Sequence, residues 1–270
     1  MGTTLIVTEI QNGKIREASY ELAAMAQALT GSETKSLVIG SGVGDDASAF
    51  ASKGGGDTLV VDNAAAANYN ADAWTAAIVA AVESSGADLV LISNTPSGWD
   101  VAPRVAALLD AGFVSDCFKI SNDGDNHVFT RRVFNGKLDA QLTASSDRVV
   151  ASVQPGATAP FEGSTDGSTQ SLDVDFSGVR TKFVEVKTAE STGVDLTKAD
   201  IIVSGGRGVG APEKFPEIIQ PLADALGGAM GASRPVVDAG WLAHPYQVGS
   251  SGQIVTPKLY VACGISGAIL

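Results

Sequence analysis

Four glycine- and serine-rich turns in the last part of the sequence contain the residue types that bind phosphate groups. Each of them follows a short apolar run, and two of them hold an arginine. They are Ile201–Gly208, which ends in Gly-Gly-Arg-Gly, Gly231–Arg234, Gln247–Gly252 and Cys263–Ile269. Backbone N–H groups of such turns, together with hydroxyl and guanidinium groups, bind anionic ligands. The pattern therefore predicts a site for a phosphorylated ligand at the ends of apolar strands.

The segments around these turns alternate between strands and helices. Ile201–Val203 and Leu259–Ala262 are apolar strands, and Lys214–Leu226 has the apolar spacing of a helix. A doubly wound domain normally has about five or six strands, whereas this part of the chain holds about three. Gly264–Ile269 resembles the start of a helix with no helix behind it. We therefore expect the natural protein to continue beyond Leu270.

The first half of the chain repeats a strand and a helix. The predicted strands are Thr4–Glu9, Ser36–Gly40, Thr58–Val61 and Asp88–Ile92. The predicted helices are Glu17–Leu29, Asp45–Ser52, Ala71–Glu83 and Ala102–Leu109, the last of them after a turn at Asn94–Asp100. Continuously apolar strands that alternate with helices indicate a parallel sheet covered on both faces.

Short extended runs replace this pattern after Ala111. They are His127–Phe134, Lys137–Ser145 and Arg148–Gln154, with the hairpin signal Asn135-Gly136 between the first two. We expect them to extend the first sheet, in part antiparallel, and we expect a loop at Gln154–Thr169 and a further strand at Arg180–Lys187. The predicted fold class is α/β. Residues 1–195 form a mostly parallel doubly wound domain with extra antiparallel strands, and residues 196–270 form an incomplete doubly wound domain.

Composition excludes several classes of function. The chain has 270 residues, of which 44% are hydrophobic, and a net charge of −12, which argues against a nucleic-acid partner. No apolar run approaches the roughly 18–20 residues that span a bilayer, and the N-terminus resembles neither a signal nor a transit peptide. We therefore expect a cytoplasmic protein that is not embedded in a membrane.

Two further features favour ordinary structural roles. Cys117 and Cys263 lie far apart in apolar surroundings, so we expect small core residues rather than a disulfide, and the cysteines and the two histidines show no metal-ligand spacing. The Ser41–Gly44 turn, Ser-Gly-Val-Gly, follows a strand and is either a phosphate loop or a tight turn before a helix. It lacks the full G-x-G-x-x-G pattern, which favours the plain turn.

Longer motifs at the same four turns resemble a known family. They are Val-Ser-Gly-Gly-Arg-Gly (203–208), Leu-Ala-Asp-Ala-Leu-Gly-Gly-Ala-Met-Gly-Ala-Ser-Arg-Pro-Val-Val-Asp-Ala-Gly (222–240), Tyr-Gln-Val-Gly-Ser-Ser-Gly-Gln-Ile-Val-Thr-Pro-Lys-Leu-Tyr (246–260) and Cys-Gly-Ile-Ser-Gly-Ala-Ile (263–269). They resemble the α subunits of electron transfer flavoproteins. The likeness extends to Ala-Pro-Arg-Val-Ala-Ala-Leu-Leu-Asp (102–110) and Val-Ser-Asp-Cys (114–117) in the first half.

The resemblance implies a function as an FAD-containing electron carrier rather than an enzyme with its own substrate. Such a subunit forms a heterodimer with a β subunit. The pair takes electrons from acyl-CoA and related dehydrogenases and passes them to a membrane quinone oxidoreductase. The location implied is the cytoplasm of a bacterium or the mitochondrial matrix of a eukaryote. Specialised relatives serve nitrogen fixation or carnitine metabolism, and a non-redox nucleotide-binding module is the alternative from another class.

The resemblance also assigns individual positions to FAD. Arg234 is expected beside the flavin ring, where its charge would raise the flavin potential. Ser251, at a position where threonine is usual, is expected to bond the ring near N5 through its hydroxyl. Arg207 is expected at the nucleotide side, and Ser266 at the pyrophosphate or ribityl chain. The full implied set is Arg207, Ser233, Arg234, Gln247, Val248, Gly249, Ser250, Ser251, Gly264, Ser266, Gly267, Ala268, Ile269 and Leu270.

Structural alternatives exist for the same residues. Arg234 could be an ordinary surface arginine, and Arg207 could pair with Glu213 inside its loop. Gln247–Gly252 could be a plain glycine and serine turn, whereas the resemblance implies that Gln247 to Gly249 supply backbone contacts. No catalytic triad or paired carboxylates stand in a recognisable frame, and a carrier needs neither because its flavin supplies the redox chemistry.

Overall fold

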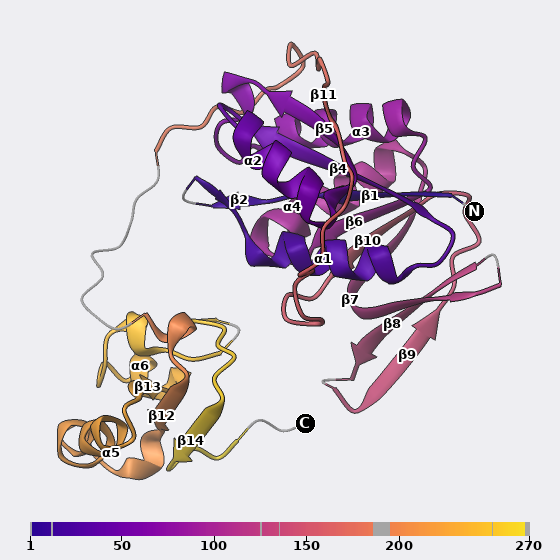
Figure 1. Ribbon diagram of the computed structural model, residues 1–270. Helices are drawn as coiled ribbons and strands as arrows, with labels where there is room; N and C mark the ends of the chain where they lie inside the picture. The colour runs from indigo at the N-terminus through magenta and orange to yellow at the C-terminus, as the bar shows by residue number, and fades with distance from the viewer. Residues whose placement is uncertain are drawn as a thin grey trace. The chain divides into compact units, whose positions relative to one another are not determined.

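Figure 1 shows the computed structural model of the chain, which describes residues 2–11, 13–124, 126–134, 136–185, 195–249 and 251–267. The chain divides into two compact units, one within Met1–Val184 and the other within Glu185–Ile269. The domain boundary that we expect between residues 195 and 196 stays a prediction, since residues 186–194 lie outside the described ranges.

A mostly parallel sheet forms the first unit, with the strand order β11-β5-β4-β1-β6-β10-β7-β8-β9. Its strands are β1 (Thr3–Val7), β4 (Glu33–Gly40), β5 (Asp57–Asp62), β6 (Leu89–Ser93), β7 (Gly112–Asp123), β8 (Asn126–Val133), β9 (Leu138–Leu142), β10 (Val149–Val153) and β11 (Thr169–Ser171). Neighbours from β11 to β7 pair parallel, and β7, β8 and β9 pair antiparallel. The predicted α/β class with extra antiparallel strands is confirmed.

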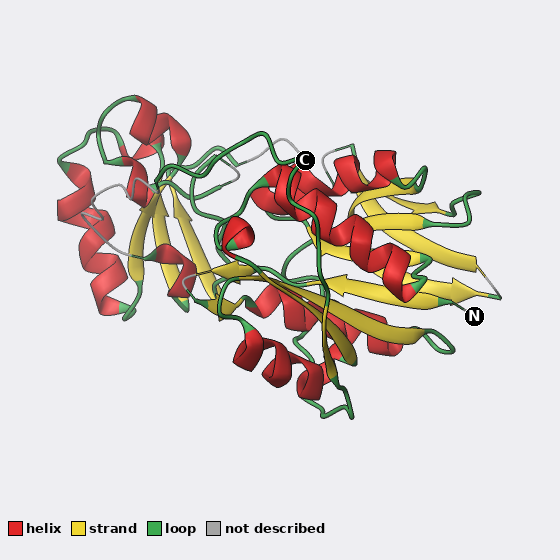
Figure 2. Cartoon of the chain, turned by 90° about the horizontal axis from the view of Figure 1, so that it is seen from above, coloured by secondary structure: helices red, strands yellow, loops and turns green. Residues whose placement is uncertain are grey.

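Helices cover both faces of this sheet, as Figure 2 shows. They are α1 (Glu17–Ala28), α2 (Gly44–Phe50), α3 (Ala71–Ser85) and α4 (Pro96–Leu108). Side chains of each strand alternate between the faces, so Leu5 packs with α3 and α4 whereas Ile6 packs with α1. Smaller elements are β2 (Ile10–Gln11), β3 (Lys14–Ile15), η1 (Ala51–Gly55) and η2 (Ala64–Ala66). Strands that are apolar on both faces need this double cover.

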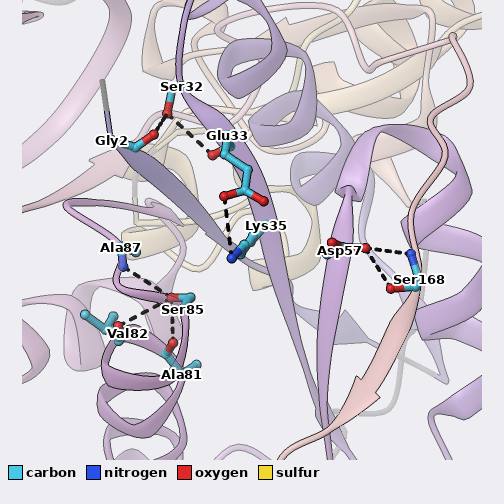
Figure 3. A network of polar contacts seen from close by, with 10 residues as sticks. All are labelled: Gly2, Ser32, Glu33, Lys35, Asp57, Ala81, Val82, Ser85, Ala87 and Ser168. Atoms are coloured by element: carbon cyan, nitrogen blue, oxygen red, sulfur yellow. Dashed lines mark hydrogen bonds and ion pairs between the residues drawn. The ribbon is translucent and has the colours of Figure 1, made fainter.

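Hydrogen bonds fix the chain at the amino ends of the parallel strands, as Figure 3 shows. The hydroxyl of Ser32 donates to the carbonyl of Gly2 at 3.2 Å, which attaches the start of β4 to the start of β1. The N–H and the hydroxyl of Ser168 donate to one carboxylate oxygen of Asp57, at 2.9 and 2.7 Å. These two bonds hold the pKa of the Asp57 carboxyl below its ordinary value and attach the segment before β11 to β5.

The fourth helix begins earlier than the sequence predicts. α4 begins at Pro96, so the predicted turn at Asn94–Asp100 is wrong for most of its length. Thr95 caps the helix, because its hydroxyl accepts a hydrogen bond from the N–H of Gly98 at 3.2 Å. A proline fits the first helical position since its missing N–H needs no partner there. A Cβ atom at Gly98 would collide with the backbone carbonyl of Ser93, so only glycine fits this first turn.

The strands differ from the prediction at two places. β7 is not predicted, because its pairing with β8 and β10 contains register shifts and Asp116 has a left-handed φ of 57°, which breaks the alternation of buried side chains. The strand predicted at Arg180–Lys187 is wrong for residues 180–185, which belong to no strand. Residues 181–185 are all exposed, so their alternation covers no core layer. Residues 186 and 187 lie outside the described ranges.

The second unit contains a parallel sheet with the order β13-β12-β14. Its elements are η3 (Leu196–Lys198), β12 (Ile201–Gly205), η4 (Arg207–Val209), η5 (Phe215–Ile219), α5 (Gln220–Ala225), β13 (Ala229–Ala232), α6 (Arg234–Asp238), η6 (His244–Tyr246) and β14 (Leu259–Cys263). The core consists of Val203, Phe215, Ile219, Ala223, Met230, Ala232 and Val236. The helix predicted at Lys214–Leu226 is present as η5 followed by α5.

The second predicted turn of this unit, Gly231–Arg234, differs from the prediction. Gly231 and Ala232 complete β13 and are not part of a turn. Arg234 then begins the short helix α6, which the sequence does not predict because Pro235 and the five-residue length hide any helical spacing.

Candidate functional site

The carboxyl ends of β12, β13 and β14 bring the predicted turns to one edge of the second sheet. Gly205 lies opposite both Ala232 and Cys263, which are the last residues of the two neighbouring strands. The turns that follow these three residues therefore leave the sheet side by side. The remaining turn joins them because the N–H of Val248 donates to the carbonyl of Ala232 at 2.9 Å. We call these turns the carboxyl edge: Gly206–Val209, Ser233–Arg234, Gln247–Gly252 and Gly264–Gly267.

Glycine backbones cross at the centre of the carboxyl edge. The N–H of Gly206 donates to the carbonyl of Cys263 at 2.8 Å, and the N–H of Gly208 donates to that of Gly264 at 2.9 Å. A Cβ atom at Gly208 would lie 2.7 Å from the Gly264 carbonyl oxygen, and one at Gly264 would lie 2.6 Å from the Gly208 carbonyl carbon. Gly264 also has a left-handed φ of 63°. Only glycine at both positions allows the two turns to approach this closely.

This crossing lies where the strand order of the second sheet reverses. The chain passes from β12 to β13 on one side and then returns to β14 on the other side of β12. In open parallel sheets, ligands bind outside the carboxyl ends of the strands at such a reversal. The place of the crossing and its exposed backbone are therefore those of a ligand site.

Arg207 lies in η4, next to the crossing, with an exposed side chain. In the part of the chain that the structure describes, its guanidinium has neither an ion-pair nor a hydrogen-bond partner. The alternative in which it pairs with Glu213 is not observed. The charge of Arg207 thus remains available to a ligand.

Ser233 and Arg234 connect the end of β13 with α6. The N–H of Ser233 donates to the carbonyl of Gly205 at 3.0 Å, while its hydroxyl makes no capping bond to the helix. The Nε of Arg234 donates to a carboxylate oxygen of Asp238 at 3.2 Å, and both side chains are more than half exposed. This contact uses one of the five N–H donors of the guanidinium and leaves the others for a ligand.

The turn after β13 and η6 is held by its own hydrogen bonds. The buried amide of Gln247 donates to the hydroxyl of Ser251 at 2.9 Å. The N–H of Gly249 donates to the carbonyl of Gln253 at 3.0 Å, and Gly249 has a left-handed φ of 129°. Ser251 is exposed, so its hydroxyl stands at the surface of the turn.

The last predicted site residues are described only in part. Gly264, Ser266 and Gly267 follow β14 and are exposed, and Gly267 has a left-handed φ of 81°. Four predicted site residues, Ser250, Ala268, Ile269 and Leu270, lie outside the described residues. The FAD contacts assigned to all of these positions stay predictions.

Sequence reasoning misses two residues that shape the carboxyl edge. Asp238 is the ion-pair partner of Arg234, and the i, i+4 spacing of the two charges is the signal that finds it. Gln253 fixes the third turn, Gln247–Gly252, because its amide donates to the carbonyl of Pro245 at 2.6 Å and accepts from the N–H of Leu196 at 3.1 Å. No sequence signal predicts the second case, since both contacts depend on the path of the loop.

Other kinds of site find less support. Within the described ranges, no three His, Cys, Asp or Glu side chains gather in a way that could hold a metal ion. Cys117 is fully buried, which raises the pKa of its thiol to about 12 and makes it unreactive. In the Ser41–Gly44 turn, the N–H of Gly42 donates to a carboxylate oxygen of Asp62 at 2.7 Å, which favours a plain turn over a phosphate loop. Along the same ranges, no helix is both long enough and apolar enough to cross a membrane.

Comparisons with known proteins cover both units. A family model described as the electron transfer flavoprotein domain matches residues 4–177, and one described as the electron transfer flavoprotein FAD-binding domain matches residues 195–270. These matches confirm the resemblance that the four turns predict.

Curated relatives extend the comparison over nearly the whole chain. It is 36% identical to the electron transfer flavoprotein subunit alpha of Bacillus subtilis, over 100% of this chain and 84% of the relative. It is 38% identical to the subunit of that name in Thermoanaerobacterium thermosaccharolyticum, over 98% of this chain and 82% of the relative. It is 35% identical to protein FixB of Clostridium saccharobutylicum, over 98% and 81%.

The residues at the carboxyl edge fit the cofactor that the second match names. A dinucleotide needs close backbone approach at its pyrophosphate, and the exposed glycines Gly208 and Gly264 carry no side chain that would block it. It also needs positive charge, which Arg207 and Arg234 supply, and hydroxyl donors, which Ser251 and Ser266 supply. The donor set contains no group that would exclude FAD.

Proposed function

This chain belongs to the electron transfer flavoprotein family, as an alpha subunit, and we propose that it holds its FAD at the carboxyl edge of the second unit. FAD is the cofactor of this family's alpha subunits, and their activity is electron transfer without a substrate turnover of their own. The observation that supports this placement most strongly is the glycine crossing of Gly208 with Gly264 at the reversal of the strand order.

The residues around the crossing divide into two groups by their position in the sheet. Arg207 and Ser266 flank the crossing of the β12 and β14 turns, which suits the phosphate groups of the cofactor. Arg234 and Ser251 lie on turns bonded to the ends of β13 and β12, which suits the flavin ring. When bound, FAD supplies the redox chemistry, and the charge of Arg234 favours the more negative reduced ring.

We infer the partners from the family and from the names of the relatives. An alpha subunit implies a beta subunit, so we propose a heterodimer. We propose further that the pair accepts electrons from acyl-CoA and related dehydrogenases and passes them to a membrane quinone oxidoreductase. The cytoplasm of a bacterium or the mitochondrial matrix is the proposed location, since relatives occur in bacteria and, by their names, in mitochondria.

The similarity to protein FixB favours a specialised electron carrier as the second candidate. In that case the same FAD site serves a different donor. Electron donors of both kinds, offered to the purified complex, distinguish the two candidates: a faster bleaching of the flavin by acyl-CoA dehydrogenase than by other donors supports the first.

Co-expression of the chain with its beta subunit tests the proposed cofactor site. We expect a yellow complex that contains one FAD and shows the absorption bands of oxidised flavin. A colourless complex that instead holds a nucleotide would support the non-redox nucleotide-binding module.

A further inference from the structure

We propose that Gln247 is a positioning residue, which sets the hydroxyl of Ser251 as a hydrogen-bond donor toward the flavin ring. The inference rests on the proposed FAD site and adds a side-chain role to a residue from which only backbone contacts are expected. Three properties of the described residues support it: a fixed turn, a buried amide and the donor chemistry of the contact.

The turn that holds both residues is fixed at its two ends. The N–H of Gln253 donates to the carbonyl of Gln247 at 2.7 Å, and the N–H of Val248 donates to the end of β13. The side chain of Gln253 bonds Pro245 and Leu196. Gln247 and Ser251 are therefore held in one geometry by backbone contacts that do not depend on a ligand.

The amide of Gln247 has little freedom inside this turn. The residue is 3% exposed, although its neighbours Gly249 and Ser251 are exposed. A Cβ atom at Gly252 would lie 2.8 Å from the Cγ of Gln247, so the side chain packs directly against the glycine backbone. Leaving the amide of a buried side chain without a hydrogen bond is costly, which favours retention of this contact.

The direction of the hydrogen bond determines what Ser251 can offer. Nε2 of Gln247 carries only N–H groups, so the oxygen of Ser251 accepts the bond of 2.9 Å. The single hydroxyl proton of Ser251 then points away from Gln247, toward the exposed side of the turn. Without the amide, that proton could rotate freely, and the hydroxyl could act as donor or acceptor.

A fixed donor distinguishes the redox states of a flavin. The oxidised ring has a lone pair at N5 that accepts a hydrogen bond, whereas the same nitrogen carries a proton in the fully reduced ring, including its anionic form. A hydroxyl held as a donor therefore favours the oxidised ring. Serine at this position lacks the methyl group that restrains threonine, so the bond from Gln247 supplies the restraint.

The Gln247→Met variant, in complex with the beta subunit, tests this role. Methionine keeps the length of the side chain and removes the donor. We expect the dissociation constant of oxidised FAD to rise about fivefold and that of reduced FAD to change less. The two-electron midpoint potential then rises by about 20 mV. The matched control is Gln220→Met, since among the described residues the amide of Gln220 bonds Asp224 alone, which is exposed on α5.

A double-mutant cycle separates positioning from a merely structural role. In a Ser251→Ala background, Gln247→Met should leave the potential unchanged, because no hydroxyl remains to be oriented. In Gln247→Glu the carboxylate can only accept a hydrogen bond, so the Ser251 proton turns inward toward it. The part of the lost affinity for oxidised FAD that depends on Ser251 should therefore be larger in this variant than in Gln247→Met. Ser251→Thr in the Gln247→Met background should restore part of the affinity.

The outcomes distinguish this inference from the proposed function. If the unmodified complex binds no FAD, the proposed function fails and the inference fails with it. If FAD binds but Gln247→Met leaves the potential unchanged, or shifts it equally in the Ser251→Ala background, only the inference is overturned. A shift that disappears in that background supports it.

Discussion

Both parallel sheets of this chain reverse their strand order, but different groups occupy the two reversals. In the first unit the reversal lies between β1 and β6, where the hydroxyl of Thr95 donates to Glu9 at 2.8 Å and Arg16 pairs with Glu9 at 3.0 Å. In the second unit the reversal lies between β12 and β14. It holds the crossed backbones of Gly208 and Gly264 and Arg207, whose guanidinium has no partner among the described residues.

The first reversal is closed by protein groups. The carboxylate of Glu9 makes it unsuitable for a phosphate, since like charges repel. Two buried polar atoms there, Nε1 of Trp74 and Oγ of Ser93, have no partner among the described residues. The cavity that they line has room for about one water molecule.

The comparison teaches that a reversal of strand order permits a ligand site without making one. The same topology serves packing in one unit and, as we propose, FAD in the other. The difference comes from the residues placed at the strand ends: a carboxylate with its own partners in the first unit, and glycines with two exposed arginines in the second.

Of the changes predicted here, alanine substitutions of a glycine at each reversal should have the largest effect, and they should separate the packing role of the first reversal from the ligand role of the second. Gly208→Ala puts a methyl group 2.7 Å from the Gly264 carbonyl oxygen, so the crossing must open. Opening costs about 1–3 kcal/mol, and the FAD affinity of the heterodimer should fall roughly 5- to 100-fold. Equilibrium titration with FAD measures this loss.

Gly98→Ala is the matched substitution at the first reversal. Its methyl group collides with the Ser93 carbonyl, so the free energy of unfolding should fall by about 1–3 kcal/mol while the FAD affinity stays unchanged. Urea unfolding and the same titration measure the two quantities. A loss of FAD from Gly98→Ala as large as that from Gly208→Ala would remove the distinction between the reversals.

Charge at the second reversal should affect the flavin potential by a moderate amount. Arg234→Ala removes a cation that favours the negatively charged reduced ring, so the two-electron midpoint potential should fall by about 30 mV, or about 1.4 kcal/mol. Asp238→Asn frees the guanidinium from its ion pair and should raise the potential. Spectroelectrochemical titration of the complex measures both shifts.

Lys258→Ala supplies the control for this experiment. Lys258 precedes β14 and pairs with Asp200 at the amino end of the sheet, opposite the carboxyl edge. Its removal changes the net charge by the same amount and should leave the potential nearly unchanged. Equal shifts from Arg234→Ala and Lys258→Ala would show that only net charge matters.

Among these predictions, a fall in pH should have the smallest effect on stability. The bonds from Ser168 lower the pKa of Asp57 in the folded protein, so Asp57 stabilises the fold above its unfolded pKa and this contribution is lost as pH falls through the folded value. Below about pH 4, stability should therefore fall more steeply in the unmodified chain than in Asp57→Asn. Urea unfolding between pH 5 and pH 3 measures both slopes, and parallel slopes would exclude a role for this carboxylate.

The elements that could be predicted from the sequence are those with a simple period. The strands β1, β4, β5 and β6 each contain a run of at least three buried apolar residues, and helix α3 has a clear apolar spacing with a capping Asn70. β7 escapes prediction because its bulges interrupt the period, and β11 because its three residues are all exposed and polar. The start of α4 is hidden because proline and glycine are turn residues as often as first-turn residues.

The candidate site was also predictable in part. Its turns could be predicted because glycine, serine and arginine recur at the ends of apolar runs. The partners of their side chains could not be predicted, because the contact of Gln247 with Ser251 depends on the path of the loop between them. Sequence therefore indicates which chemistry is present, and the three-dimensional path decides which atoms remain free for a ligand.

Hydrogen exchange of the heterodimer, with and without FAD, tests the central claim most directly. We expect FAD to slow the exchange of backbone N–H groups at the carboxyl edge, in peptides that contain Gly208, Ser233, Val248 and Gly264. Peptides that contain Gly42 or Gly98, at the strand ends of the first unit, should exchange at an unchanged rate. Protection at Gly42 or Gly98 without protection at Gly208 would contradict the account.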